Sequence, residues 1–144
     1  MDMIELDNRT GIDIDIGILQ KITNTLTEKD IELILTDNTE IQGINATFRN
    51  LDKPTDVLSF PYEPMPMSPL GSIVISADYV NSNAETFSHR PEEEITLLFI
   101  HGLLHLLGFD HETDNGEMRQ KEREIIKKFS LPSSLIVRTL KETD

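Results

Sequence analysis

The longest apolar stretch of the chain runs from Ile95 to Phe109, and His101 and His105 interrupt it near its middle. It is too long for an ordinary strand of about five or six residues. It is also shorter than the roughly 20 apolar residues that a membrane-spanning helix requires. Helices that are apolar on almost every side are buried inside a protein. The stretch therefore predicts a central core helix, and the rest of the chain must fold around it.

The sequence also marks where this helix begins and ends. Pro91 suits the first helical position, and the three Glu residues at 92–94 place negative charge where the helix dipole favours it. We expect the helix to run to about Leu107. Gly108 can then adopt the left-handed conformation that ends a helix and turns the chain sharply.

Shorter patterned segments surround the central helix. Apolar runs predict four strands, at residues 3–6, 31–37, 57–60 and 72–76. Apolar residues spaced by three and four predict helices at 13–26, 39–48 and 117–129, and a weaker helix is expected at 79–87. The expected capping residues are Asp13 or Asp15, Asn38 or Thr39, and Asp114 together with Glu117. We expect Pro132 and the polar tail to end the fold.

The order of these elements fits one layered α+β or α/β domain. We expect the α+β class: a single domain over residues 1–144, in which a small four-stranded mixed sheet packs with about five helices. Between the third and fourth strands, the segment PYEPMPMSPL at 61–70 contains four Pro and two Met. Such a segment cannot form a helix or a central strand. It predicts an exposed loop, and we interpret it as a candidate lid.

Charge excludes several classes of function. The chain has 26 Asp and Glu against 13 Lys and Arg, which gives a formal net charge of −13. A protein that coats duplex nucleic acid or a membrane surface needs a basic face. A local basic patch within the acidic whole remains compatible with this balance. The first ten residues lack the basic and apolar regions of a signal peptide, so we expect a cytoplasmic protein without membrane association.

Three of the four His form the pattern H-x-x-x-H-x-x-G-x-x-H. His101 and His105 are four residues apart on the expected helix, so their rings lie on one face, with Cβ atoms about 5–6 Å apart. The turn at Gly108 lets His111 fold back toward them. Three His with an open fourth position are typical of a catalytic zinc, whose bound water has a pKa of about 7.

A single His on an apolar helix is usually an ordinary core residue. Two imidazoles buried among Leu, Ile and Phe need partners, however, and metal ligation supplies them. Because the 144 residues include no Cys, a transition metal here must be bound by imidazole and carboxylate. The sequence therefore predicts a metal site on the long central helix and the loop after it.

The same pattern resembles the metzincin signature, with one informative difference. Those peptidases have a Glu general base directly after the first His, whereas this chain has Gly102, followed by Leu103 and Leu104. A peptidase would need a Glu from elsewhere in the chain. We therefore regard a metallopeptidase as the least favoured alternative.

Three sequence blocks resemble the YbeY family of bacterial rRNA maturation endoribonucleases. They are INATFRNLDKPTDVLSFPYE at 44–63, GSIVISADYV at 71–80 and HGLLHLLGFDH at 101–111, and the similarity extends from about Ile31 to Phe129. The resemblance implies a zinc-dependent, single-strand-specific endoribonuclease. It further implies roles in processing the 3′ end of 16S rRNA, in ribosome quality control and in late assembly of the small subunit. One departure is Ser72, where the family usually has Asp.

The resemblance also implies functions for individual residues. His101, His105 and His111 would be the metal ligands, with His101 also essential to catalysis, and Arg49 would match the functional Arg of the family. On physical grounds Arg49 could bind a phosphodiester in bidentate fashion and neutralise the charge that develops on it. The alternative is a surface ion pair with Asp52 or Asp56.

The partner and metal expected from this resemblance are RNA and zinc. The substrate would be single-stranded RNA, in particular rRNA of the small ribosomal subunit, with ribosomal proteins or assembly GTPases as further partners and no DNA specificity. Zinc is the expected ion, one per chain, although three imidazoles also accept Ni²⁺ and other divalent ions. The nucleophile is either a metal-bound water or a ribose 2′-OH.

A second hypothesis is a ribosome-assembly factor that does not cut RNA and holds a structural zinc. Such a site would be closed by a fourth protein ligand, for which Asp110, Glu112 and His89 are candidates. Without that role, His89 would be a solvated residue at a helix start. The candidate carboxylate partners of the ligand His are Asp56, Asp110, Glu112 and Asp114. The basic residues of the last helix are expected to form a solvated face that could touch rRNA: Arg119, Lys121, Arg123, Lys127 and Lys128.

Overall fold

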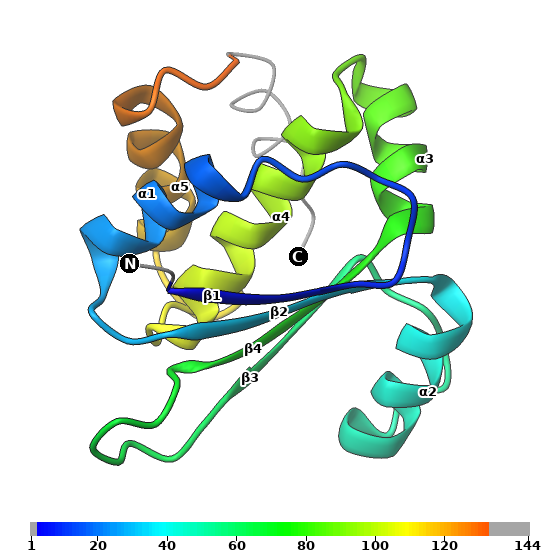
Figure 1. The fold of residues 1–144 in the computed structure, drawn as a ribbon, viewed down its shortest axis with the longest axis horizontal. Helices are drawn as coiled ribbons and strands as arrows, with labels where there is room; N and C mark the ends of the chain where they lie inside the picture. The colour runs from blue at the N-terminus through cyan, green and yellow to red at the C-terminus, as the bar shows by residue number, and fades with distance from the viewer. Residues whose placement is uncertain (1–2, 133–144) are drawn as a thin grey trace.

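Four strands form one sheet in the computed structural model, which describes residues 3–132 (Figure 1). The strands lie in the order β1-β2-β4-β3. Their bounds are Ile4–Asn8 for β1, Ile31–Thr36 for β2, Val57–Pro61 for β3 and Gly71–Ser76 for β4. β1, β2 and β4 are parallel, and β3 runs antiparallel to β4. The expected small mixed sheet is confirmed.

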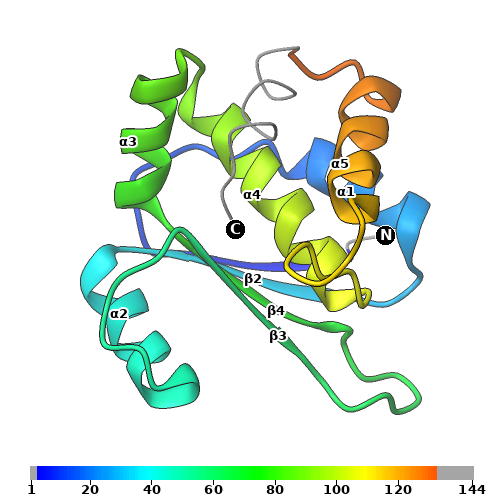
Figure 2. The same ribbon diagram turned by 180° about the vertical axis from the view of Figure 1, so that it is seen from behind.

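Five helices complete the described part of the chain, as expected for the α+β class. They are α1 (Ile16–Leu26), α2 (Asn38–Arg49), α3 (Ala77–Phe87), α4 (Pro91–Leu106) and α5 (Glu117–Lys128). α1, α3, α4 and α5 lie on one side of the sheet, whereas α2 lies on the other side near one end (Figures 1 and 2). None of these helices, within residues 3–132, is long and apolar enough to span a bilayer.

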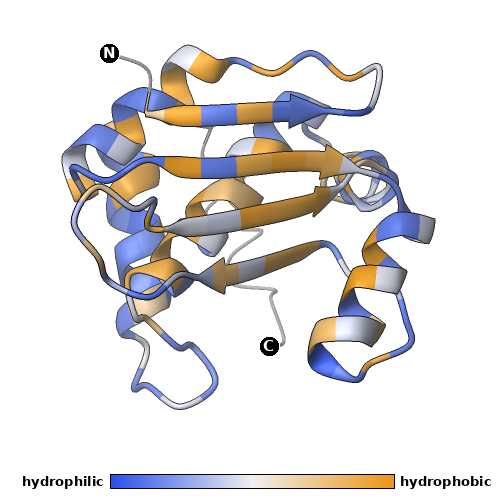
Figure 3. Cartoon of the chain, turned by 60° about the horizontal axis from the view of Figure 1, so that its bottom comes forward, coloured by the Kyte–Doolittle hydropathy of each residue, from blue (hydrophilic) through white to orange (hydrophobic). Residues whose placement is uncertain are grey.

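The central position of α4 agrees with the prediction from its apolar sequence. α4 packs against β3 and β4 and also contacts α1, α3 and α5. Of its 16 residues, 11 are buried. The main core forms between this helix and the apolar strands, including Leu33, Ile73, Phe99 and Leu103. Figure 3 shows how apolar residues dominate the two central strands, β2 and β4.

The close approach of α4 to the sheet explains Gly102. A Cβ atom at this position would lie 2.9 Å from Cγ2 of Ile73 and 3.0 Å from Oγ of Ser59. Ser59 Oγ donates a hydrogen bond of 3.0 Å to the carbonyl oxygen of Gly102. A Glu general base has no room at this position, so the packing adds a physical reason against the peptidase alternative.

Helix starts follow local capping chemistry, with one correction. Asp15, one of the two expected residues, caps α1 by accepting from the Ile18 N–H at 3.2 Å. For α2 the expectation of Asn38 or Thr39 is wrong, because Asp37 is the cap and accepts from the Glu40 N–H at 2.9 Å. Asn38 is occupied by tertiary contacts. Its N–H donates to Asp78 at 2.8 Å, and its Oδ1 accepts from Ser76 at 2.6 Å.

Two other boundaries differ slightly from the sequence expectation. α3 begins at Ala77, directly after β4, so the strand passes into the helix without a loop. The start of α5 has Gly116 at the N-cap, while Asp114 accepts hydrogen bonds from the N–H groups of Gly116 and Met118. Residues 133–144, the expected tail, lie outside the described residues.

The expected exposed loop at 61–70 joins β3 to β4. Pro61 still belongs to β3, and the chain is anchored at both ends of the loop. The Tyr62 hydroxyl donates to Glu32 at 2.7 Å, and the Leu70 N–H donates to the Asp30 carbonyl at 2.8 Å. Residues 62–70 do not line the cleft described below. The lid interpretation stays a prediction.

Candidate metal centre

The three His of the sequence pattern come together in space. His101 and His105 project from α4, and His111 comes from the turn after this helix. The Nε2 atoms of His101 and His105 are 3.2 Å apart, and one ligand atom from each of the three rings lies within 4.8 Å of the others. The expected placement of the triad is confirmed, and these side chains could hold a metal ion.

The turn after α4 is the element that returns His111 to the helix. Gly108 has a φ of 102°, a left-handed conformation that a side chain would disfavour. Its N–H donates to the His105 carbonyl at 3.0 Å, and the Phe109 N–H donates to the Leu104 carbonyl at 3.0 Å. These bonds close the helix end, as the sequence predicted from the Gly.

The donor set fits a transition metal. His105 Nδ1 lies 3.0 Å from the Phe109 carbonyl oxygen, so this nitrogen donates and leaves the lone pair of Nε2 facing His101. His111 Nδ1 is buried without a hydrogen-bond partner among the described residues. Burying a polar atom without a hydrogen-bond partner costs folding free energy, and metal ligation or an ordered water removes this cost. Three imidazoles suit zinc and similar divalent ions.

The surroundings also favour the protonation state that a metal requires. Burial lowers the pKa of His105, and the neighbouring His101 and His111 lower this pKa further. Burial, followed by the effect of His101, also lowers the pKa of His111. Both rings therefore stay neutral at pH values where an ordinary His begins to gain a proton. The neutral imidazole is the form that binds metal.

The triad opens into a cleft of about 900 Å³. Its lining includes three cations, Arg49, Lys53 and Arg119, and three acids, Asp56, Asp110 and Glu112. The whole chain has twice as many acids as bases, so the cleft is much less acidic than the rest of the molecule. A divalent ion at the triad would make the formal charge of the cleft positive.

Arg49 reaches this cleft from the last turn of α2, on the far side of the sheet from α4 (Figure 1). The alternative of a surface ion pair with Asp52 or Asp56 is not realised among residues 3–132. Asp52 instead accepts from Gln42 at 3.0 Å, and Asp56 accepts from the Val57 N–H at 2.8 Å. The fold thus brings a guanidinium and three imidazoles to one cavity.

Comparison with known proteins agrees with this arrangement. The family model described as Endoribonuclease YbeY matches residues 10–130. This chain belongs to the YbeY family. Endoribonuclease YbeY from Nautilia profundicola is 67% identical over 136 residues, which cover 94% of this chain and 98% of the relative. The YbeY protein of Aliarcobacter butzleri is 64% identical, with coverage of 94% and 99%.

A solved structure has a similar fold. The solution structure of TM1509 from Thermotoga maritima aligns with a TM-score of 0.60 at 29% sequence identity. The alignment covers 88% of this chain and 89% of that one. The match therefore includes most of the sheet-and-helix framework that positions the triad.

One buried carboxylate at the YbeY triad was missed by sequence reasoning. Glu122 of α5 is fully buried, and its Oε1 lies 3.6 Å from Nδ1 of His101 and 3.7 Å from Nη1 of Arg119. Two of the four expected carboxylates, Asp110 and Asp114, accept hydrogen bonds from backbone N–H groups of the turn. A signal was present: Glu122 shares the buried face of α5, whose members are Met118, Glu122, Ile125 and Ile126.

Arg119 also differs from its expected environment. We expected it on a solvated basic face with the other cations of the last helix. Its side chain is only 18% exposed and lies beside Glu122 at the cleft, whereas Lys127 and Lys128 are exposed. The helix therefore presents one cation toward the YbeY site and others toward solvent.

His89 is a second correction. We expected a solvated residue, but its side chain is 1% exposed, and Nε2 lies 2.6 Å from Oε1 of the fully buried Glu94. Asn83 Nδ2 donates to the other oxygen of Glu94 at 3.0 Å, and the Phe87 ring stacks on the His89 ring. Glu94 of α4 is thereby connected to Asn83 of α3 and to His89 in the segment between the two helices.

The hypothesis of a structural zinc loses support, because within residues 3–132 the triad gains no ligand from His89, Asp110 or Glu112.

Proposed function

We propose that this chain is a metal-dependent endoribonuclease that cuts single-stranded RNA and consists of one catalytic domain. The observation that carries the proposal is the shared cleft, in which Arg49 and the three His line one cavity. Membership of the YbeY family and relatives named as endoribonucleases give independent support.

In this proposal His101, His105 and His111 hold one zinc or another divalent ion. When bound, the ion would supply Lewis acidity and would activate either a water or a ribose 2′-OH as nucleophile. The protein groups orient the ligands. The Phe109 carbonyl fixes the ring of His105, and the Glu122 carboxylate lies beside Nδ1 of His101. Such outer contacts set ring orientation and raise the basicity of the ligating nitrogen.

Arg49 would bind the scissile phosphate. Its planar guanidinium offers paired N–H donors that match two phosphate oxygens. As the nucleophile adds, negative charge grows on those oxygens, and a cation that is already in place stabilises that charge most in the transition state. Lys53 and Arg119 line the same cavity and would help to attract the polyanionic strand.

We further propose rRNA of the small ribosomal subunit as the substrate, with roles in 3′-end processing of 16S rRNA, late subunit assembly and quality control. The support is the resemblance of the three sequence blocks to this family. The net charge of −13 gives weak non-specific affinity for nucleic acid. Ribosomal proteins or assembly GTPases would therefore help to deliver the enzyme to its site.

The deciding experiment is cleavage of an end-labelled single-stranded RNA by the zinc-loaded chain, with a duplex of the same sequence alongside. We expect Arg49→Ala to lower kcat by about 100-fold or more, with zinc content unchanged. His101→Ala should lose both zinc and cleavage. Lys127→Ala removes an exposed cation from outside the cleft and serves as the control. Cleavage that survives chelation and both site substitutions would contradict the proposal.

A further inference from the structure

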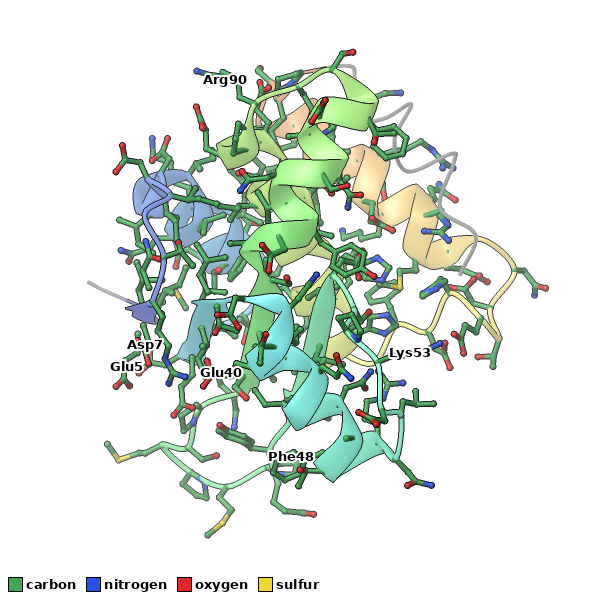
Figure 4. All side chains as sticks on the ribbon, turned by 90° about the vertical axis from the view of Figure 1, so that its right-hand side faces the viewer. Glu5, Asp7, Glu40, Phe48, Lys53 and Arg90 are labelled. Carbon is green, nitrogen blue, oxygen red and sulfur yellow. The ribbon has the colours of Figure 1, made fainter. Side chains whose placement is uncertain are left out.

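Phe48 is a large aromatic side chain that the fold leaves in the open. It lies one residue before Arg49, near the end of α2, and 70% of its surface is exposed. Both residues line the cleft that holds the three His. Figure 4 shows Phe48 at this end of α2 and Lys53 on the segment that follows the helix. An exposed aromatic ring beside cations in the same cleft can contact the face of a nucleic-acid base.

We propose that Phe48 is a stacking platform for a base of single-stranded RNA, next to the nucleotide whose phosphate Arg49 binds. The inference rests on the proposed function, because it assigns a subsite within the same cleft. It adds a contact to the base, whereas the metal and Arg49 act on the phosphate.

The ring of Phe48 is held in a defined orientation. It meets Phe60 of β3 edge to face, with ring centroids 5.6 Å apart and planes inclined by 62°. Phe60 is anchored in turn, since it packs against the small core of Ile41, Leu58 and Val74. An edge-to-face contact steadies a ring and leaves at least one of its two faces uncovered by its partner. A preorganised aromatic face binds a flat base with little loss of side-chain freedom.

The segment after α2 is also fixed relative to Phe48. Asn50 ends the helix in a left-handed conformation, with a φ of 58°. The buried Asn45 then holds the turn, because its carbonyl oxygen accepts from the Leu51 N–H at 3.3 Å and its Nδ2 donates to the Lys53 carbonyl at 3.0 Å. One short stretch therefore presents an aromatic ring followed by two cations, Arg49 and Lys53.

Charge complementarity favours RNA over a protein partner for this ring. Cations beside an aromatic platform match the alternation of phosphate and base along a single strand. Every base has an apolar face, so stacking here requires no particular sequence. A base locked in a duplex cannot reach such a ring unless it is unstacked. The platform would therefore also favour single strands over duplexes.

The chain contains no Trp, which permits a direct test. In the zinc-loaded Phe48→Trp variant, the new indole is the only one and reports on its own surroundings. We expect a 2′-O-methyl RNA, verified to be intact by gel electrophoresis after the titration, to quench its emission through stacking. An abasic strand of the same length and charge should leave the emission unchanged and should bind more weakly.

Substitutions then separate stacking from general apolar contact. Phe48→Leu keeps an apolar side chain without a ring, and we expect it to weaken RNA binding about tenfold at unchanged zinc content. Phe48→Tyr should bind like the wild type. Leu6→Ala provides the control, since Leu6 is 38% exposed on β1 at the opposite edge of the sheet. Thermal unfolding of each variant would verify that the fold is intact.

The outcomes also separate this inference from the proposed function. Wild-type RNA affinity in Phe48→Leu, with no quenching in Phe48→Trp, would overturn the platform while RNA cleavage by the wild type still stood. Unchanged RNA affinity with weaker binding of Phe48→Leu to purified small-subunit ribosomal proteins would also overturn it and identify a protein contact. If the emission of Phe48→Trp were quenched only by RNA that carries bases, while the wild-type chain cut no RNA, the stacking role of Phe48 would be supported. The proposed nuclease activity would then be contradicted.

Discussion

The buried carboxylate of Glu122 lies 3.6 Å from Nδ1 of His101 and connects α5 to the first His of the triad. The Nε2 atom of the same ring faces His105 at 3.2 Å. A carboxylate behind a ligating imidazole holds the ring in place and makes the inward nitrogen a better donor. α5 therefore supports the candidate metal centre from outside the His triad.

Replacing Glu122 tests this connection. We expect Glu122→Gln, which keeps the shape but removes the charge, to weaken zinc binding by about tenfold or more. Competition with a chromophoric chelator measures the affinity. Glu124→Gln is the matched control, because Glu124 is exposed on the same helix. Equal zinc affinity of the two variants would show that the Glu122 charge does not act on the triad.

The pH dependence of zinc binding should reflect burial of the ligands. Protons compete with the metal wherever the pH falls below the pKa of a ligand. The pKa values of His105 and His111 lie below that of ordinary His, mainly because of burial. The contribution of His105 and His111 to zinc affinity should therefore begin to fall at a lower pH than that of ordinary His ligands.

A peptide with the sequence of residues 101–111 is the reference for that measurement. It lacks the fold, so its imidazoles should lose zinc as the pH falls through their ordinary range. Zinc titrations from pH 8 to pH 5 would compare the two. Identical pH profiles for peptide and protein would argue against an effect of burial.

Gly102 offers a test of packing, in which two effects oppose each other. Ala is favoured over Gly in a helix by about 1 kcal/mol. Its Cβ would, however, lie 2.9 Å from the fully buried Ile73, and overpacking costs about 1–3 kcal/mol. We expect the packing cost to prevail, so that Gly102→Ala lowers the free energy of unfolding in urea. Gly43→Ala should raise this free energy, because Gly43 of α2 has open space around it.

The buried His89–Glu94 pair should matter for stability and not for metal binding. Removing one partner costs about 1–3 kcal/mol for a buried hydrogen bond and about 3–5 kcal/mol for a buried salt bridge. We expect His89→Ala to lose about 3 kcal/mol of unfolding free energy and to bind zinc normally. Arg90→Ala, which removes ion pairs made by a side chain that is 71% exposed, should cost less than about 1 kcal/mol. Loss of zinc from folded His89→Ala would return His89 to the ligand candidates.

Features encoded by neighbouring residues were predictable from the sequence. The long helix α4, its Pro start, the turn at Gly108 and the meeting of three His all follow from spacing within residues 91–111. The cap of α2 was missed because Asn38 and Asp37 are both good caps. Contacts of Asn38 with Ser76 and Asp78, from a distant part of the chain, decide between them.

Partners that come from other segments were harder to predict. Glu122 reaches His101 only because α5 packs on α4, and periodicity alone does not say which neighbour a buried acid will meet. For His89, a surface position was the expectation for a residue between two helices. The His89 side chain is buried instead, because α3 and α4 pack together around it, and its partner is Glu94.

The two halves of the cleft depend on different parts of the fold. All three imidazoles come from residues 101–111, whereas Arg49 arrives from α2 across the sheet. Without α2 the triad could still hold a metal ion, but the cleft would lack Arg49, the residue proposed to bind the phosphate. Under the proposed function, metal binding alone would therefore not give an active enzyme: activity would also need α2 in its place beside the sheet.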